Sequence, residues 1–174
     1  MGDLSFNFNH RDFACHCKEC EGEYRINLSL VGALEFIADH FNRPVKIIEG
    51  FRCGKCIEKM AASPKSKHAK GKAANIVVEG IPLPEVYKFA DTIPEVKGLG
   101  FYPDKGFIHI DVRKDDKKDE KKEWISEGGR ISLMTPDKKR QYGLLQIANP
   151  STSLDGTRDK SLGVSGEQGR TANS

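Results

Sequence analysis

The sequence predicts one domain that combines helices with short β-strands and ends in a polar tail. Three observations support this organisation: an amphipathic helical pattern, apolar runs bounded by glycine and proline, and a change of composition near residue 148. With 174 residues, of which 37% are hydrophobic, the chain can bury one sizeable core but hardly two. We therefore expect a single domain over residues 1–147. The tail, 148–174, has almost no apolar side chains and is expected to be disordered.

Two segments carry the apolar periodicity of helices. Residues 27–42 place apolar side chains at three- and four-residue intervals, and Asn27 is suited to be the N-cap. Residues 83–93 repeat the pattern more briefly. We expect the first of these helices to have a structural role.

Short apolar runs predict two strands, "PVKIIEG" over 44–50 and "AANIVVEG" over 73–80. The loop between them, 51–72, is long for a compact domain, and such loops are usually functional or disordered. A hairpin is predicted further on, where "GLGFY" and "FIHIDVR" are joined by the turn sequence "PDKG".

The second hairpin strand alternates with period two. One face carries Ile108 and Ile110, and the other carries His109 and Asp111. A solvated strand face is the simple explanation of the polar pair. Together with His68 and Asn75, however, the pair offers imidazole and oxygen ligands beside a long loop, which is a set that zinc accepts.

The five cysteines fall into two clusters, "CHCKEC" and "CGKC", and their odd number excludes complete pairing within the chain. Two C-x2-C spacings suit tetrahedral zinc, and free thiols are the alternative. The set that we consider for a structural metal is Cys17, Cys20, Cys53 and Cys56. We expect Cys17 and Cys53 to lie close together, because their segments can pack against the same edge.

Charge and hydropathy narrow the range of partners. Lys and Arg number 28 against 25 Asp and Glu, and the resulting net charge of +3 is too small to indicate a nucleic-acid partner. The N-terminal residues lack the pattern of a secretory signal, and no apolar run approaches the ~20 residues that span a bilayer. We expect a soluble, cytoplasmic monomer without a membrane partner.

A charged insertion is predicted over residues 114–123. Like charges recur there at a spacing of four residues, which opposes an isolated helix. Trp124 and Ile125 are expected to return the chain to the core.

Three segments together resemble the M15 zinc peptidases, the group of D-Ala-D-Ala carboxypeptidases and L-alanyl-D-glutamate endopeptidases that shares its fold with hedgehog signalling domains. "SKHAKGKAANI" resembles the motif S-x-H-x-x-G-x-A-x-D-I, "IIEGFRC" resembles the S-G-Y-R segment, and "GLGFYPDKGFIHIDVR" resembles the closing hairpin. The resemblance covers roughly residues 5–125. It implies an α+β domain in which helices pack on a small antiparallel sheet, with a zinc cleft on the sheet face.

The resemblance also implies roles for individual residues. His68, Asn75 and His109 would be the zinc ligands, and Ser66 would bind substrate. Arg52 would hold substrate and stabilise the oxyanion, because a permanently charged guanidinium suits a preorganised donor.

The general base is assigned less directly. Asp111 shares a strand face with His109 and is the first candidate, and Asp104 in the hairpin turn is the fallback. An alternative alignment makes Asp111 a metal ligand and gives His109 the catalytic role.

Asn75 is the main departure from the family pattern, which has an aspartate at this place, and Glu49 stands where the family has serine. A neutral amide removes the direct attraction of a carboxylate for Zn²⁺. Two functions follow. The first is a zinc-dependent peptidase acting on peptidoglycan stem peptides at D-amino-acid bonds, which would reach the cell wall by a route other than a signal peptide. The second is a weakened or inactive binding module, in which Asn75 only caps a strand.

Overall fold

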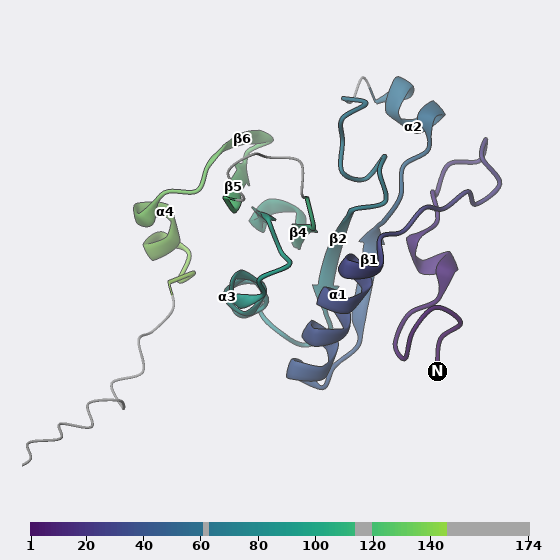
Figure 1. Ribbon diagram of the computed structural model, residues 1–174. Coiled ribbons are helices and arrows are strands. Elements are labelled where there is room, and N and C mark those ends of the chain that lie inside the picture. Colours follow the sequence, from purple (N-terminus) through teal and green to yellow (C-terminus); the bar gives the residue numbers. More distant parts are fainter. Residues whose placement is uncertain (61–62, 114–119, 146–174) are drawn as a thin grey trace, which may run out of the picture.

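One six-stranded β-sheet organises the computed structural model, which describes residues 1–60, 63–113 and 120–145 (Figure 1). The strand order is β1-β2-β4-β3-β5-β6. The strands are β1 Val45–Glu49, β2 Ala73–Val78, β3 Gly98–Tyr102, β4 Phe107–Asp111, β5 Lys122–Glu127 and β6 Arg130–Leu133. The helices are α1 Leu28–Phe41, α2 Gly54–Lys59, α3 Leu83–Thr92 and α4 Pro136–Gln141, with short 3-10 turns η1 His10–Phe13 and η2 Pro103–Lys105. The predicted α+β class is confirmed.

The sheet is antiparallel except for one pair, β3 and β5, which run parallel. The antiparallel pairing that the sequence predicts thus holds for four of the five strand pairs. Asp111 at the end of β4 and Lys122 at the start of β5 both lie opposite Gly98 of β3. β4 therefore finishes and β5 begins at the same end of the sheet, on either side of β3. From there β5 runs in the direction of β3.

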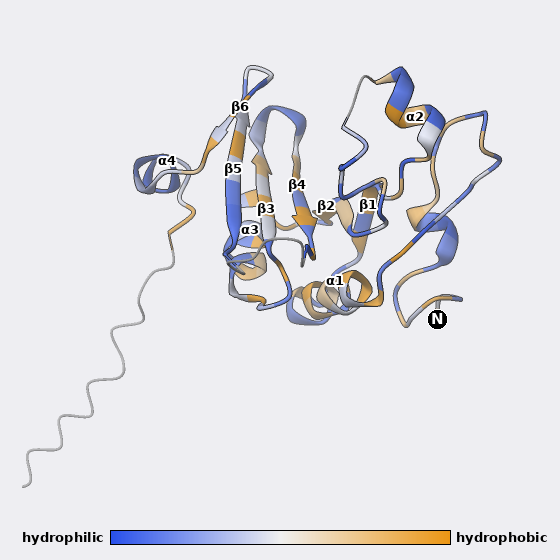
Figure 2. Cartoon of the chain, turned by 45° about the horizontal axis from the view of Figure 1, so that its top comes forward, coloured by the Kyte–Doolittle hydropathy of each residue, from blue (hydrophilic) through white to orange (hydrophobic). Residues whose placement is uncertain are grey.

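The two predicted helices form and cover the same face of the sheet (Figure 2). Asn27 caps α1 as expected, because its side-chain oxygen accepts a hydrogen bond from the Ser29 N–H at 2.9 Å. The core beneath them includes Leu34, Ile37, Ile76, Val86, Tyr87, Leu99, Phe101, Ile108, Ile110 and Ile125. The predicted alternation in β4 is confirmed, since Ile108 and Ile110 are fully buried in this core.

The long loop before β2 contains the short helix α2, which the sequence did not predict. Six residues are too few to show a helical apolar stripe. At the other end of the chain, β5 begins at Lys122, inside the segment predicted as a charged insertion. Residues 114–119 of that insertion and the predicted disordered tail, 148–174, lie outside the described residues.

The N-terminal segment crosses the end of β1 in close contact (Figure 1). The Phe51 N–H donates to the Phe13 carbonyl at 2.8 Å, and Phe8 and Phe13 are buried in the main core. A Cβ atom on Gly50 would lie 2.6 Å from the Phe13 Cα. Only glycine therefore permits this crossing.

Among the described residues, no helix has both the length and the apolarity to cross a membrane.

Gly50→Ala is expected to lower the free energy of unfolding by roughly 1–3 kcal/mol, because the added methyl group meets backbone that cannot easily move. Gly32→Ala is the matched control, since a Cβ there would meet nothing within 4 Å and the residue lies inside α1. That control should gain about 0.5–1 kcal/mol. Urea denaturation measures both, and equal stabilities for the two variants would contradict the predicted crowding at Gly50.

Candidate metal centre

Three polar residues form a row across neighbouring strands. Asn75 of β2 is paired with Glu49 of β1 on one side and with His109 of β4 on the other. Directly paired residues present their side chains on the same face of a sheet. The face opposite the helices therefore carries a carboxylate, an amide and an imidazole side by side.

The register of β1 decides that Glu49 belongs to this row. Ile47 pairs with Ile76, but the register then shifts by one residue, so that Glu49 instead of Ile48 lies opposite Asn75. Such a shift turns the next side chain to the other face of the sheet. Ile48 is left exposed, and the Glu49 carboxylate enters the site.

His68 reaches the row from the loop before β2. It is buried, and its Nδ1 lies 2.6 Å from the Gly50 carbonyl oxygen. A carbonyl can only accept, so Nδ1 carries the proton and the lone pair is left on Nε2. That Nε2 lies 3.2 Å from the Nδ1 of His109. Gly71 closes the turn with a positive φ of 64°, and a Cβ there would lie 2.3 Å from the Arg25 carbonyl oxygen.

His109 is held from both ends of its ring. Nε2 faces Oδ2 of Asp111 at 3.2 Å, and Nδ1 lies 2.9 Å from Oδ1 of Asn75. If the carboxylate fixes the proton on Nε2, the Nδ1 lone pair is free to face His68 and Asn75. His109 Nδ1 then lies within 3.2 Å of both the His68 nitrogen and the Asn75 oxygen, so that two imidazole nitrogens and one amide oxygen are adjacent. These donors fit zinc in kind, although the amide oxygen is neutral.

Asp111 is fully buried and bonded on both oxygens. Oδ1 accepts from the Arg113 Nε at 2.7 Å, and Oδ2 accepts from a terminal nitrogen of the same guanidinium. Burial raises the pKa of Asp111, but the hydrogen bonds from Arg113 and His109 outweigh it and hold this pKa well below the usual range. A general base needs a pKa near the working pH. The contacts thus fit a residue that orients His109 better than they fit the predicted base.

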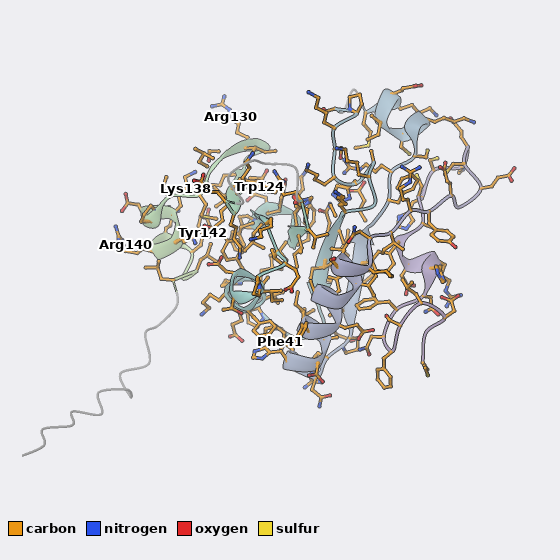
Figure 3. All side chains as sticks on the ribbon, in the orientation of Figure 1. Phe41, Trp124, Arg130, Lys138, Arg140 and Tyr142 are labelled. Carbon is orange, nitrogen blue, oxygen red and sulfur yellow. The ribbon has the colours of Figure 1, made fainter. Side chains whose placement is uncertain are left out.

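Two glycines of β3 make room for this arrangement. A Cβ on Gly98 would lie 2.1 Å from the Asp111 Oδ2, and one on Gly100 would lie 2.6 Å from the Trp124 ring. The side chain of Trp124, labelled in Figure 3, comes from β5. It occupies the space over Gly100, and its ring centroid lies 5.1 Å from that of His109. Sequence reasoning assigned Trp124 only to the core. The alternating glycines of "GLGFY" are the signal that could have indicated large side chains from neighbouring strands on this face.

Glu49 and Arg52 form a bidentate ion pair at the end of the row. The Asn75 side-chain amide donates to Oε2 of Glu49 at 2.9 Å. Burial raises the pKa of Glu49, but Arg52, helped by the nearby His68 and His109, brings it below its ordinary value. The negative charge that Asn75 lacks is therefore present on the adjacent strand.

The remaining predicted residues lie in turns. Ser66 is half-buried two residues before His68, and its backbone N–H donates to the Ser63 carbonyl at 2.9 Å. Asp104, the fallback base, accepts the Gly128 N–H at 2.6 Å in the turn after β3. The roles predicted for both residues stay predictions.

The neutral state of His68 makes stability depend on pH. Burial, followed by the charge of His109, lowers the pKa of His68 from 6.5 to about 4. Between these values the unfolded chain binds the proton more readily than the folded one, so the free energy of unfolding should fall as the pH drops from about 6.5 to about 4. Urea denaturation of metal-free protein at several pH values measures this. In His68→Gln the fall should be smaller, and an identical pH dependence in both proteins would contradict the assignment.

The part of the sequence that carries this site is similar to known proteins. Residues 6–111 match the family described as Peptidase M15. The peptidoglycan L,D-endopeptidase MepK of Escherichia coli (strain K12) is 35% identical over 75 residues, which is 40% of this chain and 41% of that protein. The probable peptidoglycan L,D-endopeptidase MepK of Haemophilus influenzae is 31% identical over 76 residues, 41% of this chain and 40% of that protein. The chain thus spans about two fifths of the length of these relatives. Because the family match extends over more than half of its residues, the chain belongs to the Peptidase M15 family.

Proposed function

We propose that this chain is a zinc-dependent hydrolase that cleaves peptide bonds in peptidoglycan stem peptides. The observation that carries the proposal is the convergence of His68 Nε2, His109 Nδ1 and Asn75 Oδ1 on one face of the sheet. The names of the similar bacterial proteins support peptidoglycan as the substrate and an L,D-endopeptidase mode over a carboxypeptidase mode.

His68, Asn75 and His109 would hold the metal. A zinc ion bound there would lower the pKa of a water molecule and polarise the scissile carbonyl. The protein's own contribution is to aim the ligands. The Gly50 carbonyl fixes the tautomer of His68, and Asp111, itself held by Arg113, does the same for His109. Such partners of metal-binding histidines orient the rings and raise their basicity.

Glu49 supplies the negative charge of the site in place of residue 75. Its carboxylate is ionised, half-buried and within hydrogen-bonding distance of the Asn75 amide. A carboxylate next to a metal ligand in a partly buried site acts on a cation far more strongly than it would in water. The neutral Asn75 is then one part of a two-residue unit whose other part is anionic.

Arg52 is bound to Glu49 and would contact the substrate from there. Its side chain is mostly buried against Glu49, and its backbone N–H donates to the His68 carbonyl at 3.3 Å. A guanidinium fixed beside the ligands can stabilise negative charge on the oxygen of the cleaved amide without reorganisation. Asp111 serves as a positioning residue in this scheme, and Ser66 remains a predicted contact to the substrate.

A second candidate function is an inactive M15-fold module that binds peptidoglycan peptides without cleaving them. The ion pair between Glu49 and Arg52 favours it, because the guanidinium neutralises the carboxylate that would otherwise attract the metal. The two functions differ in whether Glu49 contributes to zinc affinity.

Four proteins test the proposal: the chain itself, Glu49→Gln, Asn75→Asp, and the two changes combined. Glu49→Gln should weaken zinc binding by roughly 10- to 100-fold, as loss of a supporting group does at other zinc sites. The combined variant should recover most of the loss, because the carboxylate returns on the neighbouring strand. Asn75→Asp alone should bind zinc more tightly than the chain itself.

Zinc affinity is measured by competition with a chromophoric chelator, and cleavage of a stem peptide is measured by mass spectrometry. The His68→Ala variant is the control, because any zinc that it still binds is held elsewhere in the chain. Unchanged affinity and cleavage in Glu49→Gln would contradict the role of its charge. Absence of both zinc at this centre and cleavage in all four proteins would favour the inactive module.

A further inference from the structure

All five cysteines of the chain gather at one place, beside the Glu49 and Arg52 end of the candidate metal centre. The Sγ atoms of Cys15, Cys17, Cys53 and Cys56 lie within 4.8 Å of one another. Cys15 and Cys56 are 3.4 Å apart at sulfur, and so are Cys17 and Cys53, which confirms the predicted proximity of this last pair. Four thiolates bound to zinc at about 2.3 Å would lie about 3.8 Å apart. The distances between the four sulfurs are therefore already close to the edge length of such a tetrahedron.

Local backbone structure brings the sulfurs together from two segments. The Cys15 N–H donates to the Glu23 carbonyl and the Glu23 N–H to the Cys20 carbonyl, both at 2.9 Å, which folds the N-terminal segment into a loop. Cys53 is the N-cap of α2, and Cys56 lies one turn further along the chain. The Cys53 N–H points at the Cys15 sulfur at 3.5 Å. A backbone N–H directed at sulfur stabilises a thiolate.

The apolar surface that is buried around this loop is too small to hold the loop in place by itself. Cys15, Phe51 and Cys53 form a separate buried cluster, and the partly buried side chains around it are the other three cysteines. The segment from Cys15 to Glu23 contains neither helix nor strand. A cluster of this size can bury little apolar surface. A metal bound by residues from both segments would supply folding energy directly.

We propose that Cys15, Cys17, Cys53 and Cys56 bind a structural zinc ion as a tetrathiolate site. The metal would fasten the N-terminal loop to the segment that follows β1. That segment carries Arg52, directly before Cys53, and Gly50, whose carbonyl holds His68. The site is independent of the proposed peptidase function, although it would keep two parts of that centre in place.

The ligand set differs in one member from the set considered on the sequence, with Cys15 in place of Cys20. Cys20 Sγ lies 3.2 Å from Cys17 Sγ, but it is not part of the group in which all sulfurs are mutually close. It is also directed toward the carbonyls of Cys15 and Cys17, at 4.0 and 3.9 Å. Cys20 thus provides a matched control within the same loop.

The test uses the full chain carrying His68→Ala, which removes the other metal centre. Purified under reducing conditions, it should contain one zinc ion per chain, and its cobalt form should show strong thiolate-to-cobalt absorption in the near ultraviolet. Adding Cys20→Ser should leave both signals unchanged, and adding Cys15→Ser should abolish both. Loss of metal in Cys20→Ser with retention in Cys15→Ser would overturn the assigned ligands.

Thiol titration of the unmodified chain keeps the proposal testable if Cys15→Ser does not fold. With zinc bound, only Cys20 should react rapidly with a thiol reagent, and a chelator should expose four more thiols and lower the melting temperature. Five thiols that react at once without release of zinc would overturn the site, as would a disulfide among them. These outcomes are independent of peptide cleavage, so they can be distinguished from a failure of the proposed function.

Discussion

The site depends on the register that pairs Asn75 with Glu49 on one strand and with His109 on the next. Side chains change face at every residue of a strand, so a slip by one position would separate these three groups completely. The one-residue shift after Ile47 is therefore as important as the ligands themselves. It turns Glu49 out of the direction of the core and beside the Asn75 amide.

Buried contacts to the far sides of His68 and His109 keep the two imidazoles in position. The Gly50 carbonyl holds His68, and Asp111 holds His109 while bonded to Arg113. Gly98 leaves space for the Asp111 carboxylate, and any side chain there would collide with it. Backbone, small residues and a buried ion pair thus restrict the two rings to one arrangement, which is the preorganisation that the proposed zinc site would need.

Charge at position 75 is where we expect this chain to depart from the family pattern that its sequence resembles. An aspartate at position 75 would place the negative charge on β2, whereas Glu49 places it on β1, one strand away. The carboxylate also binds Arg52, so in the proposed function one ion pair would couple the charge near the metal to stabilisation of the oxyanion. We infer that the two residues act as a unit, and that the effect of a change at either of them depends on the other.

The sequence by itself determined two of the helices, α1 and α3, as well as the hairpin and the identity of most polar groups in the site. Apolar periodicity located α1 and α3, and alternation in β4 placed His109 and Asp111 on one face, because these patterns are local. Tertiary structure alone decided that Glu49 enters the site, that Trp124 covers Gly100, and that Cys15 instead of Cys20 joins the compact group of sulfurs. Each of these depends on strand order, on a register shift or on the path of a loop. Those features arise from contacts between residues far apart in the chain, so a local pattern such as the alternating glycines of "GLGFY" shows only that space is left, and not which side chain fills it.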